Sequence, residues 1–324
     1  MTQLLIPRRR LAALAAAPLA LPGLVAAQGD WPNRPITIVV PYPPGGTSDL
    51  SARPLTDPLA RILGQPVVIE NRAGAGGTIG AEAVARARPD GHTLLAFPQA
   101  VLTVAQHMMQ LPFDPATAFQ PLSMSTVAYG IIAAHPSVPF RDVPGFIAHA
   151  RAHPNQLRFG SAGPGSITQL SGEVFADAAG IRIEHVPYRG SAPSLTDLLA
   201  GRIQLLFDPV ATPAVVDGRL IGLATNAQRR NPQLPNLPTL RELGMERAEV
   251  VPWFGMAVPA GVPAPIFARL ADALQRALAL PEVATAMTPL GLTPSFEPPD
   301  VFAARVTRER AMFGELIRRL DIRV

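Results

Sequence analysis

Short apolar runs recur along this chain, separated by loops and by stretches with helical spacing. The run at 36–40 (ITIVV) is continuously apolar and rich in β-branched residues, which is typical of a strand buried on both faces. Loops rich in glycine and then helical patterns follow such runs. In the first part of the chain we therefore predict strands at 36–40, 67–70 and 93–97, with helices after residue 47 and over 78–88.

The helix predicted after residue 47 contains two prolines. Thr47 or Ser48 can cap its start, and Gly64 is suited to its end. A proline inside a regular helix costs about 3 kcal/mol, because it removes a backbone donor and clashes with the preceding turn. Pro54 and Pro58 therefore predict a kink or an early break in this helix.

A second α/β unit is predicted from about Tyr129 onward, because the same alternation of strands and helices returns. Its expected strands are near 129–134 and at 157–160, 183–186, 204–207 and 220–224. Its expected helices are at 143–151, 167–179 and 193–200, and helical spacing returns at 264–280 and 299–320. These patterns predict a signal segment at 1–27, a first lobe at 28–128, a second lobe at 129–250, and a return to the first lobe with C-terminal helices at 251–324.

The N-terminus has the pattern of a secretory signal peptide. Arginines 8–10 form a positive block, the stretch at 11–26 is apolar, and small residues precede Ala27. A membrane anchor is the alternative, but Pro18 and Pro22 interrupt the stretch, and a spanning helix needs about 20 apolar residues. We expect cleavage near Ala27 and export to the periplasm, by the general or the twin-arginine route.

Composition excludes several functions. The chain carries a formal charge of +4, and loss of the three leader arginines leaves +1. A nucleic-acid binder is expected to show a stripe of basic residues, and the sequence has none. There is no cysteine, which excludes thiol nucleophiles, disulfides and iron–sulfur ligation. There is also no lysine, which excludes Schiff-base chemistry and a P-loop lysine. We predict no cofactor.

Eight motifs in order resemble the periplasmic solute receptors of the tripartite tricarboxylate transporter family, also called Bug or TctC-like proteins. The motifs are 31–36 (WPNRPI), 40–49 (VPYPPGGTSD), 70–77 (ENRAGAGG), 89–95 (PDGHTLL), 161–166 (SAGPGS), 186–190 (VPYRG), 237–240 (LPTL) and 253–255 (WFG). The sequence departs from the family pattern at His92, where a tyrosine is usual, and at Pro164, where a small polar residue is frequent.

This resemblance implies a two-lobed α/β fold of the type II periplasmic-binding-protein class, with a ligand cleft between the lobes. It further implies a monomer that captures a small carboxylate by flytrap closure and delivers it to membrane transporter subunits. A co-receptor role for a membrane sensor kinase shares all these features. The expected ligand-binding residues are Tyr42, Gly45, Gly46, Thr47, Ser48, Asp49, Gln99, Ser161, Ala162, Gly163, Ser166, Tyr188 and Asp208.

The chemistry of the first glycine loop suits an anion. Glycines at 45 and 46 allow backbone N–H groups to approach a ligand closely, and the loop opens onto a helix N-terminus. A plain tight turn is the alternative interpretation. Asp49 can bind an amine or water, or cap its own helix. Ser161, Gly163 and Ser166 repeat the arrangement in the second unit, where a capped helix start is the alternative.

Three other candidates follow later strands. Asp208 ends a predicted strand, where parallel sheets bind ligands, or it makes a structural turn. Tyr188 either reaches the cleft or packs between the lobes, and Gln99 follows the third strand. An α/β hydrolase or lyase using Asp49, Asp208 and a histidine is the enzymatic alternative, but no G-x-S-x-G elbow is present. No H-E-x-x-H motif is present either, and we predict no metal site at His149 and His153.

Overall fold

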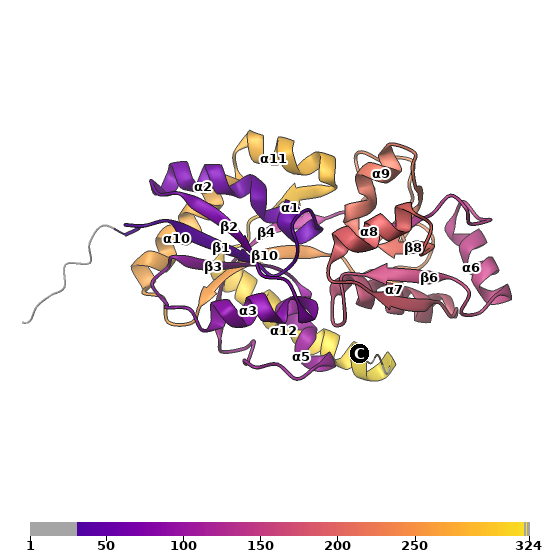
Figure 1. The fold of residues 1–324 in the computed structure, drawn as a ribbon, viewed down its shortest axis with the longest axis horizontal. Helices are drawn as coiled ribbons and strands as arrows, with labels where there is room; N and C mark the ends of the chain where they lie inside the picture. Colours follow the sequence, from indigo (N-terminus) through magenta and orange to yellow (C-terminus); the bar gives the residue numbers. More distant parts are fainter. Residues whose placement is uncertain (1–30, 321, 323–324) are drawn as a thin grey trace, which may run out of the picture. The chain divides into compact units, whose positions relative to one another are not determined.

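A computed structural model describes residues 31–320 and 322, so the predicted signal peptide lies outside the described residues. The first of two mixed sheets has the strand order β11-β4-β10-β3-β1-β2 (Figure 1). β1 runs parallel to β2 and β3, whereas β10 is antiparallel to both β3 and β4. The strands are β1 (Ile36–Val40), β2 (Val67–Asn71), β3 (Thr93–Pro98), β4 (Phe119–Ala128), β10 (Trp253–Pro259) and β11 (Leu292–Pro294).

The second sheet repeats this arrangement, with the order β7-β6-β8-β5-β9. β6 is parallel to β7 and β8, and β5 is antiparallel to β8 and β9. Four strands of each sheet therefore run in one direction, and the strands that oppose them are β10 and β11 in the first sheet and β5 in the second. The strands are β5 (Ile131–Ala134), β6 (Arg158–Ser161), β7 (Glu184–Pro187), β8 (Leu205–Phe207) and β9 (Ile221–Thr225).

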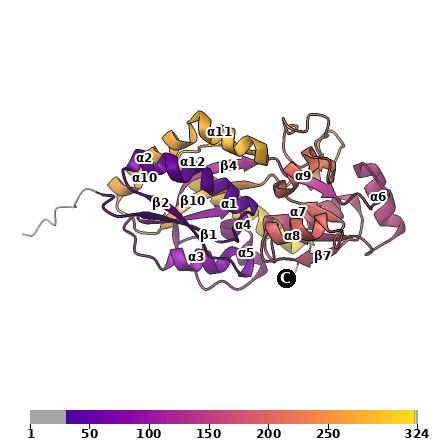
Figure 2. The ribbon, with the colours of Figure 1, turned by 45° about the horizontal axis from the view of Figure 1, so that its top comes forward.

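Helices cover both faces of the first sheet (Figures 1 and 2). Apolar residues of α3 and α12 pack with Val39, Leu95 and Phe97 in one core, and α2 packs against α10 on the opposite side. The helical segments of this lobe are α1 (Thr47–Ala52), η1 (Arg53–Leu55), α2 (Thr56–Leu63), η2 (Ala75–Gly77), α3 (Thr78–Ala85), α4 (Ala100–Thr103), α5 (Ala105–Met108), α10 (Ala264–Leu278), α11 (Pro281–Met287), η5 (Thr288–Leu290) and α12 (Pro299–Leu320).

The second sheet is also covered on both faces, as the alternation along β5 requires. Ile132 and Ala134 belong to the core that includes α6 and α7, whereas Ile131 and Ala133 belong to the core with α8 and α9. The helical segments are α6 (Val143–Ala152), α7 (Ile167–Ala179), α8 (Ser191–Leu199), η3 (Pro209–Ala211), α9 (Thr212–Val216) and η4 (Glu246–Ala248).

The prolines act as the sequence indicates. The helix breaks at Pro54, where η1 separates α1 from α2. Pro58 is the third residue of α2, a position whose N–H has no partner within the helix, so it is accommodated at little cost. Gly64 ends α2 in the left-handed conformation, with φ of 75°. None of the helices in the described part of the chain is long and apolar enough to cross a bilayer.

Candidate functional site

The carboxyl ends of β1, β3, β6, β7 and β8 meet around a small cavity between the two sheets. Its volume is about 20 Å³, which is room for about one water molecule. Open α/β sheets bind their ligands at such strand ends. The cavity is lined by Tyr42, Thr47, Ser48, Pro98, Ala162, Ser166, Ile167, Thr168, Ser191, Asp208, Pro209, Pro252 and Phe254.

Asp208 joins the two lobes at this cavity. Its side chain is 1% exposed, and its Oδ1 accepts hydrogen bonds from Thr47 Oγ1 at 2.7 Å and from the Val210 amide at 2.9 Å. Its Oδ2 accepts a hydrogen bond from Ser191 Oγ. Burial raises the pKa of Asp208 above its usual range, although the hydrogen bonds from Ser191, Val210 and Thr47 oppose this shift. No arginine lines the cavity.

Helices α7 and α8 both begin at the cavity wall. Ser166 caps α7, because its Oγ accepts the Gln169 amide at 3.3 Å. Thr168 Oγ1 accepts the Ala162 amide at 2.8 Å and so fixes the loop before α7. The first amides of a helix have no partner within it, and its N-terminal end carries a partial positive charge. The two helix starts therefore supply positive potential without a cationic side chain.

Asp49 organises the first glycine loop in this structure. The Gly45 amide donates to Asp49 Oδ2 at 3.1 Å, so in this structure it does not face the cavity. Asp49 also accepts from Arg53 Nη2 at 2.6 Å and from Asn71 Nδ2 at 3.0 Å. Burial alone raises the pKa of Asp49, but these three donors together lower it. Asp49 therefore holds the loop rather than an amine ligand here, and Gly46 is the N-cap of α1.

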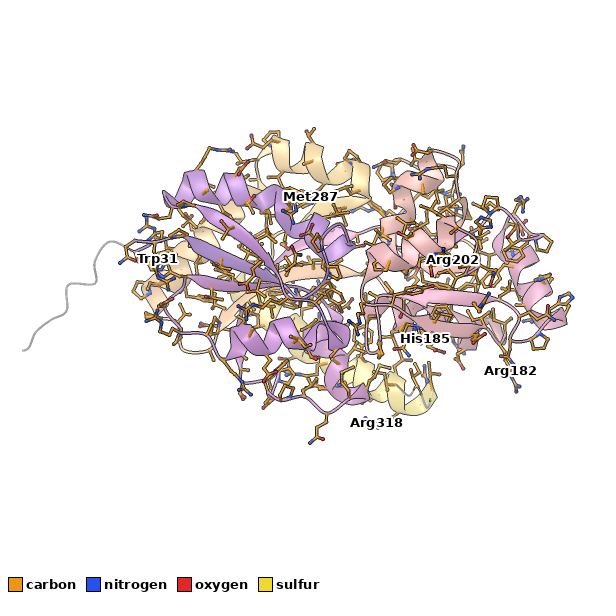
Figure 3. The ribbon with its side chains drawn as sticks, viewed as in Figure 1. Trp31, Arg182, His185, Arg202, Met287 and Arg318 are labelled. Carbon is orange, nitrogen blue, oxygen red and sulfur yellow. The ribbon has the colours of Figure 1, made fainter. Side chains whose placement is uncertain are left out.

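The second loop is held by a serine–histidine contact. Ser161 Oγ lies 2.6 Å from His185 Nε2 and accepts the Gly163 amide at 3.1 Å. Burial lowers the pKa of His185 to about 4, so the ring is neutral and its Nε2 can accept the Ser161 proton. Figure 3 shows His185 on the second lobe. Ser161 and Gly163 thus shape the loop and do not line the cavity.

Two further candidates lie away from this cavity. Tyr188 donates its hydroxyl proton to Asp197 Oδ2 at 2.8 Å, and its ring packs against the core beside α8. Burial raises the pKa of Tyr188 to about 12. Gln99 lines a different cavity and donates to Glu309 Oε2 at 2.7 Å. In this structure neither side chain reaches the cavity at the strand ends.

The cavity also includes residues that the sequence interpretation missed, above all Ser191, Thr168, Pro252 and Phe254. Ser191 directly follows the motif at 186–190, so its position after the β7 strand end was a usable signal. Phe254 lies in β10, a strand that the sequence analysis did not predict. In the described residues no group of three or more histidine, aspartate or glutamate side chains could hold a metal ion.

Close approaches of backbone bring the two lobes together beside the cavity. A Cβ atom on Gly76 would lie 2.3 Å from the carbonyl oxygen of Pro164, which belongs to the other lobe. A Cβ atom on Gly190 would lie 2.7 Å from Cδ of Pro43. Both glycines have positive φ, at 63° and 124°. This fit between glycine loops requires residues without side chains.

Two α/β lobes, each with parallel strands that end at a shared cavity, define a solute-binding protein. A family model described as the tripartite tricarboxylate transporter family receptor matches residues 51–322. The chain belongs to this family, whose members are periplasmic solute-binding proteins. One relative, the UPF0065 protein in the tcbD-tcbE intergenic region of a Pseudomonas species, is 34% identical, and the alignment covers 96% of this chain and 94% of the relative.

Solved structures agree with this assignment. MatC from Rhodopseudomonas palustris, solved with bound malate, is 33% identical with a TM-score of 0.84, covering 89% of this chain and 100% of MatC. An R. palustris protein solved with adipate is 32% identical with a TM-score of 0.86, covering 91% and 99%. The periplasmic binding protein BugD is 31% identical with a TM-score of 0.86, covering 90% and 99%. The predicted two-lobed fold class is confirmed.

Proposed function

We propose that this protein captures a small carboxylate between its lobes in the periplasm and performs no chemistry on it. The main support is the cavity at the strand ends, where residues of both lobes meet at Asp208. The starts of α7 and α8 provide donors and positive potential for one carboxylate group. The related structures with malate and adipate support the same ligand class.

Binding requires the lobes to separate. Ligand pockets usually have volumes of about 300–1,000 Å³, far above the 20 Å³ found here. The hydrogen bond from Thr47 to Asp208 crosses between the lobes, whereas Ser191 lies in the same lobe as Asp208. A ligand would therefore enter an open form, in which the Thr47–Asp208 bond is broken, and the lobes would close on it. This is the flytrap motion that the resemblance implied.

We further propose that the closed protein delivers its ligand to membrane transporter subunits and acts as a monomer. The family description supports the transporter as the partner. The arginine block, apolar stretch and small residues before Ala27 support export by a cleaved signal peptide. The domain boundaries at 28–128, 129–250 and 251–324 remain predictions. The same applies to the ligand-binding residues.

A thermal-shift screen followed by calorimetry tests the binding function. The panel contains malate, adipate, citrate, acidic amino acids and aromatic acids. A ligand at about 100 times its Kd stabilises the folded protein by about 2.7 kcal/mol. If no member of the panel shifts the melting temperature, or if one is converted to a product, the proposal is wrong.

A matched pair of serine variants on α8 tests the location of the site. Ser191 lines the cavity and donates to Asp208, whereas Ser194 donates to the Ser191 carbonyl at 2.8 Å and does not line it. We expect Ser191→Ala to weaken ligand binding about tenfold, as loss of a hydrogen bond to a charged group does. Ser194→Ala should lower stability without this loss of affinity. Equal losses of affinity would place the site elsewhere.

A further inference from the structure

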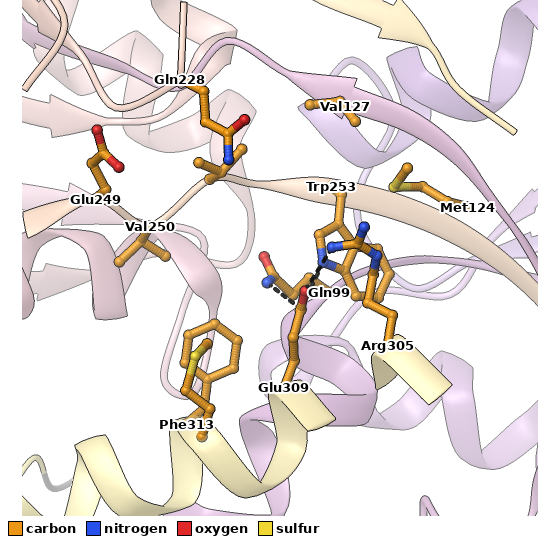
Figure 4. A pocket seen from close by; sticks show the side chains of 12 residues that line it. Gln99, Met124, Val127, Gln228, Glu249, Val250, Trp253, Arg305, Glu309 and Phe313 are labelled. Carbon is orange, nitrogen blue, oxygen red and sulfur yellow. Dashed lines mark hydrogen bonds and ion pairs between the residues drawn. The ribbon is translucent and has the colours of Figure 1, made fainter. Parts of the chain in front are cut away.

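A second cavity lies where the chain crosses between the sheets, and we call it the crossover cavity. Its volume is about 320 Å³, and its lining includes Gln99, Gln228, Val250, Trp253, Glu309 and Phe313 (Figure 4). This volume is within the range of ordinary small-molecule sites. Alternate residues around the start of β10 point to the two cavities, because Trp253 lines this one while Pro252 and Phe254 line the cavity at the strand ends. The two cavities are thus on opposite faces of the same strand.

One buried acceptor in this lining has no partner. Gln99 is 3% exposed, and its Oε1 accepts no hydrogen bond from any of the described residues. Its orientation is fixed, because Nε2 donates to the Glu309 carboxylate at 2.7 Å and a carboxylate only accepts. In Figure 4 the amide oxygen points away from Glu309, towards the side of the cavity where Gln228 and Val250 lie. A buried acceptor left without a donor is destabilising, and a donor from a ligand would remove that cost.

The carboxylates around the crossover cavity outnumber the cations that neutralise them. Glu309 and Glu297 share Arg305, at 3.1 Å from Nη1 to Glu309 and 2.9 Å from Nε to Glu297. Glu249, also in the lining, is paired with Arg241 at 2.8 Å. Three carboxylates and two guanidinium groups leave one negative charge. A buried charge of this kind is stabilised by a cation that donates hydrogen bonds.

The apolar part of the lining limits the shape of such a cation. Val250, Trp253 and Phe313 form hydrophobic and aromatic walls beside the polar groups (Figure 4). An ammonium group near an aromatic ring also gains cation–π attraction. We propose that the crossover cavity binds a small primary ammonium compound, whose N–H group donates to Gln99 Oε1 and whose short hydrocarbon body packs on these walls.

The fluorescence of Trp253 provides a local readout. The chain has two tryptophans, so a Trp31→Phe variant leaves Trp253 as the single reporter. The probe is n-butylammonium chloride. Tetramethylammonium is the control cation without N–H donors, and butyrate is the control anion with a similar short hydrocarbon chain. We expect a saturable change with n-butylammonium and at least tenfold weaker binding of both controls. Equal binding of tetramethylammonium, or no change with any probe, overturns the proposal.

Two nearly isosteric variants test the groups themselves. Gln99→Met removes the acceptor, and Glu309→Gln removes the negative charge that Gln99 and Trp253 contact. Each substitution should weaken the binding of n-butylammonium at least tenfold. The far-ultraviolet circular dichroism of each variant should match that of the unaltered protein. If either variant fails to fold, a crystal structure of the unaltered protein with n-butylammonium decides. An ammonium nitrogen within hydrogen-bond distance of Gln99 Oε1 supports the proposal, and a water molecule alone at that position refutes it.

Discussion

Gly76 offers a test of lobe closure that is separate from the chemistry of the ligand. It lies in the left-handed region with φ of 63°, and an added Cβ would be 2.3 Å from the Pro164 carbonyl oxygen in the opposite lobe. Ordinary contacts of this kind begin at 3.4 Å, so the two loops would have to separate by about 1.1 Å. The Gly76→Ala substitution should therefore destabilise the closed form more than the open form.

Gly64 provides the matched control. Its φ is 75°, but a Cβ added there meets no atom within 4 Å. Both alanine variants carry the cost of a left-handed non-glycine residue, about 1–2 kcal/mol. Only Gly76→Ala adds the clash across the lobes, and overpacking of this kind costs about 1–3 kcal/mol. Because 1.4 kcal/mol is a factor of ten in affinity, ligand binding should weaken about 5- to 150-fold in Gly76→Ala alone.

Two measurements separate closure from stability. Urea unfolding gives the cost of the left-handed alanine, which should be similar in both variants. Calorimetry with the strongest carboxylate of the screen gives the affinity, and small-angle scattering reports whether ligand still makes the protein more compact. If Gly76→Ala binds as tightly as Gly64→Ala and contracts to the same extent, the Gly76–Pro164 contact does not belong to the ligand-bound form and the reasoning fails.

Three further outcomes are expected. Burial holds the pKa of His185 at about 4, below 6.5 in the unfolded chain, so stability is lost as the pH falls from 6.5 towards 4. The His185→Gln variant should lose less stability than the unaltered protein between pH 7.5 and 4.5. We expect the difference, measured by urea unfolding, to be ~1–2 kcal/mol because His185 is partly exposed. Burial raises the pKa of Asp208, so stability falls as pH rises above about 3.9, and Asp208→Asn should lack this fall when unfolding is compared at pH 4 and 7. Thr47→Val should weaken carboxylate binding about tenfold by calorimetry, and an unchanged Kd would contradict a role for its bond to Asp208.

The parallel strands and their helices could be predicted because their signals are local. The run at 36–40 is a strand with the predicted bounds, and the predicted helices at 167–179 and 299–320 also agree with α7 and α12. β4 (Phe119–Ala128) was missed because Pro121 and four polar side chains, at 120, 123, 125 and 126, interrupt its apolar pattern. β10 was not predicted, although the motif at 253–255 lies at its start. Its pairing with β3 and β4 depends on segments more than 120 residues away.

The candidate site, like the fold, could be predicted from the sequence only where its contacts are local. The sequence indicated that Thr47 and Asp208 follow strand ends, but each was also assigned a local alternative, as a helix cap or a turn. Asp208 accepts the Val210 amide, as a capping residue does, and it also contacts Thr47, which lies 161 positions away. No periodicity in the chain encodes that second contact, because it depends on how the lobes close. The same limit applies to Gly45, whose amide donates to Asp49, a neighbour along the chain, instead of facing the cavity.

The contact between Thr47 and Asp208 has a further consequence for binding. A buried carboxylate at the closing surface repels a second carboxylate unless a proton or a donor lies between them. Thr47 and Ser191 already donate their hydroxyl protons to the Asp208 carboxylate. If an anionic ligand accepted these protons instead, the buried charge of Asp208 would lose two of its hydrogen-bond donors. The ligand must then receive its hydrogen bonds from the helix starts of α7 and α8, while the hydroxyl groups stay on Asp208. The low density of positive charge around the cavity is consistent with a ligand recognised by backbone donors and not by ion pairing.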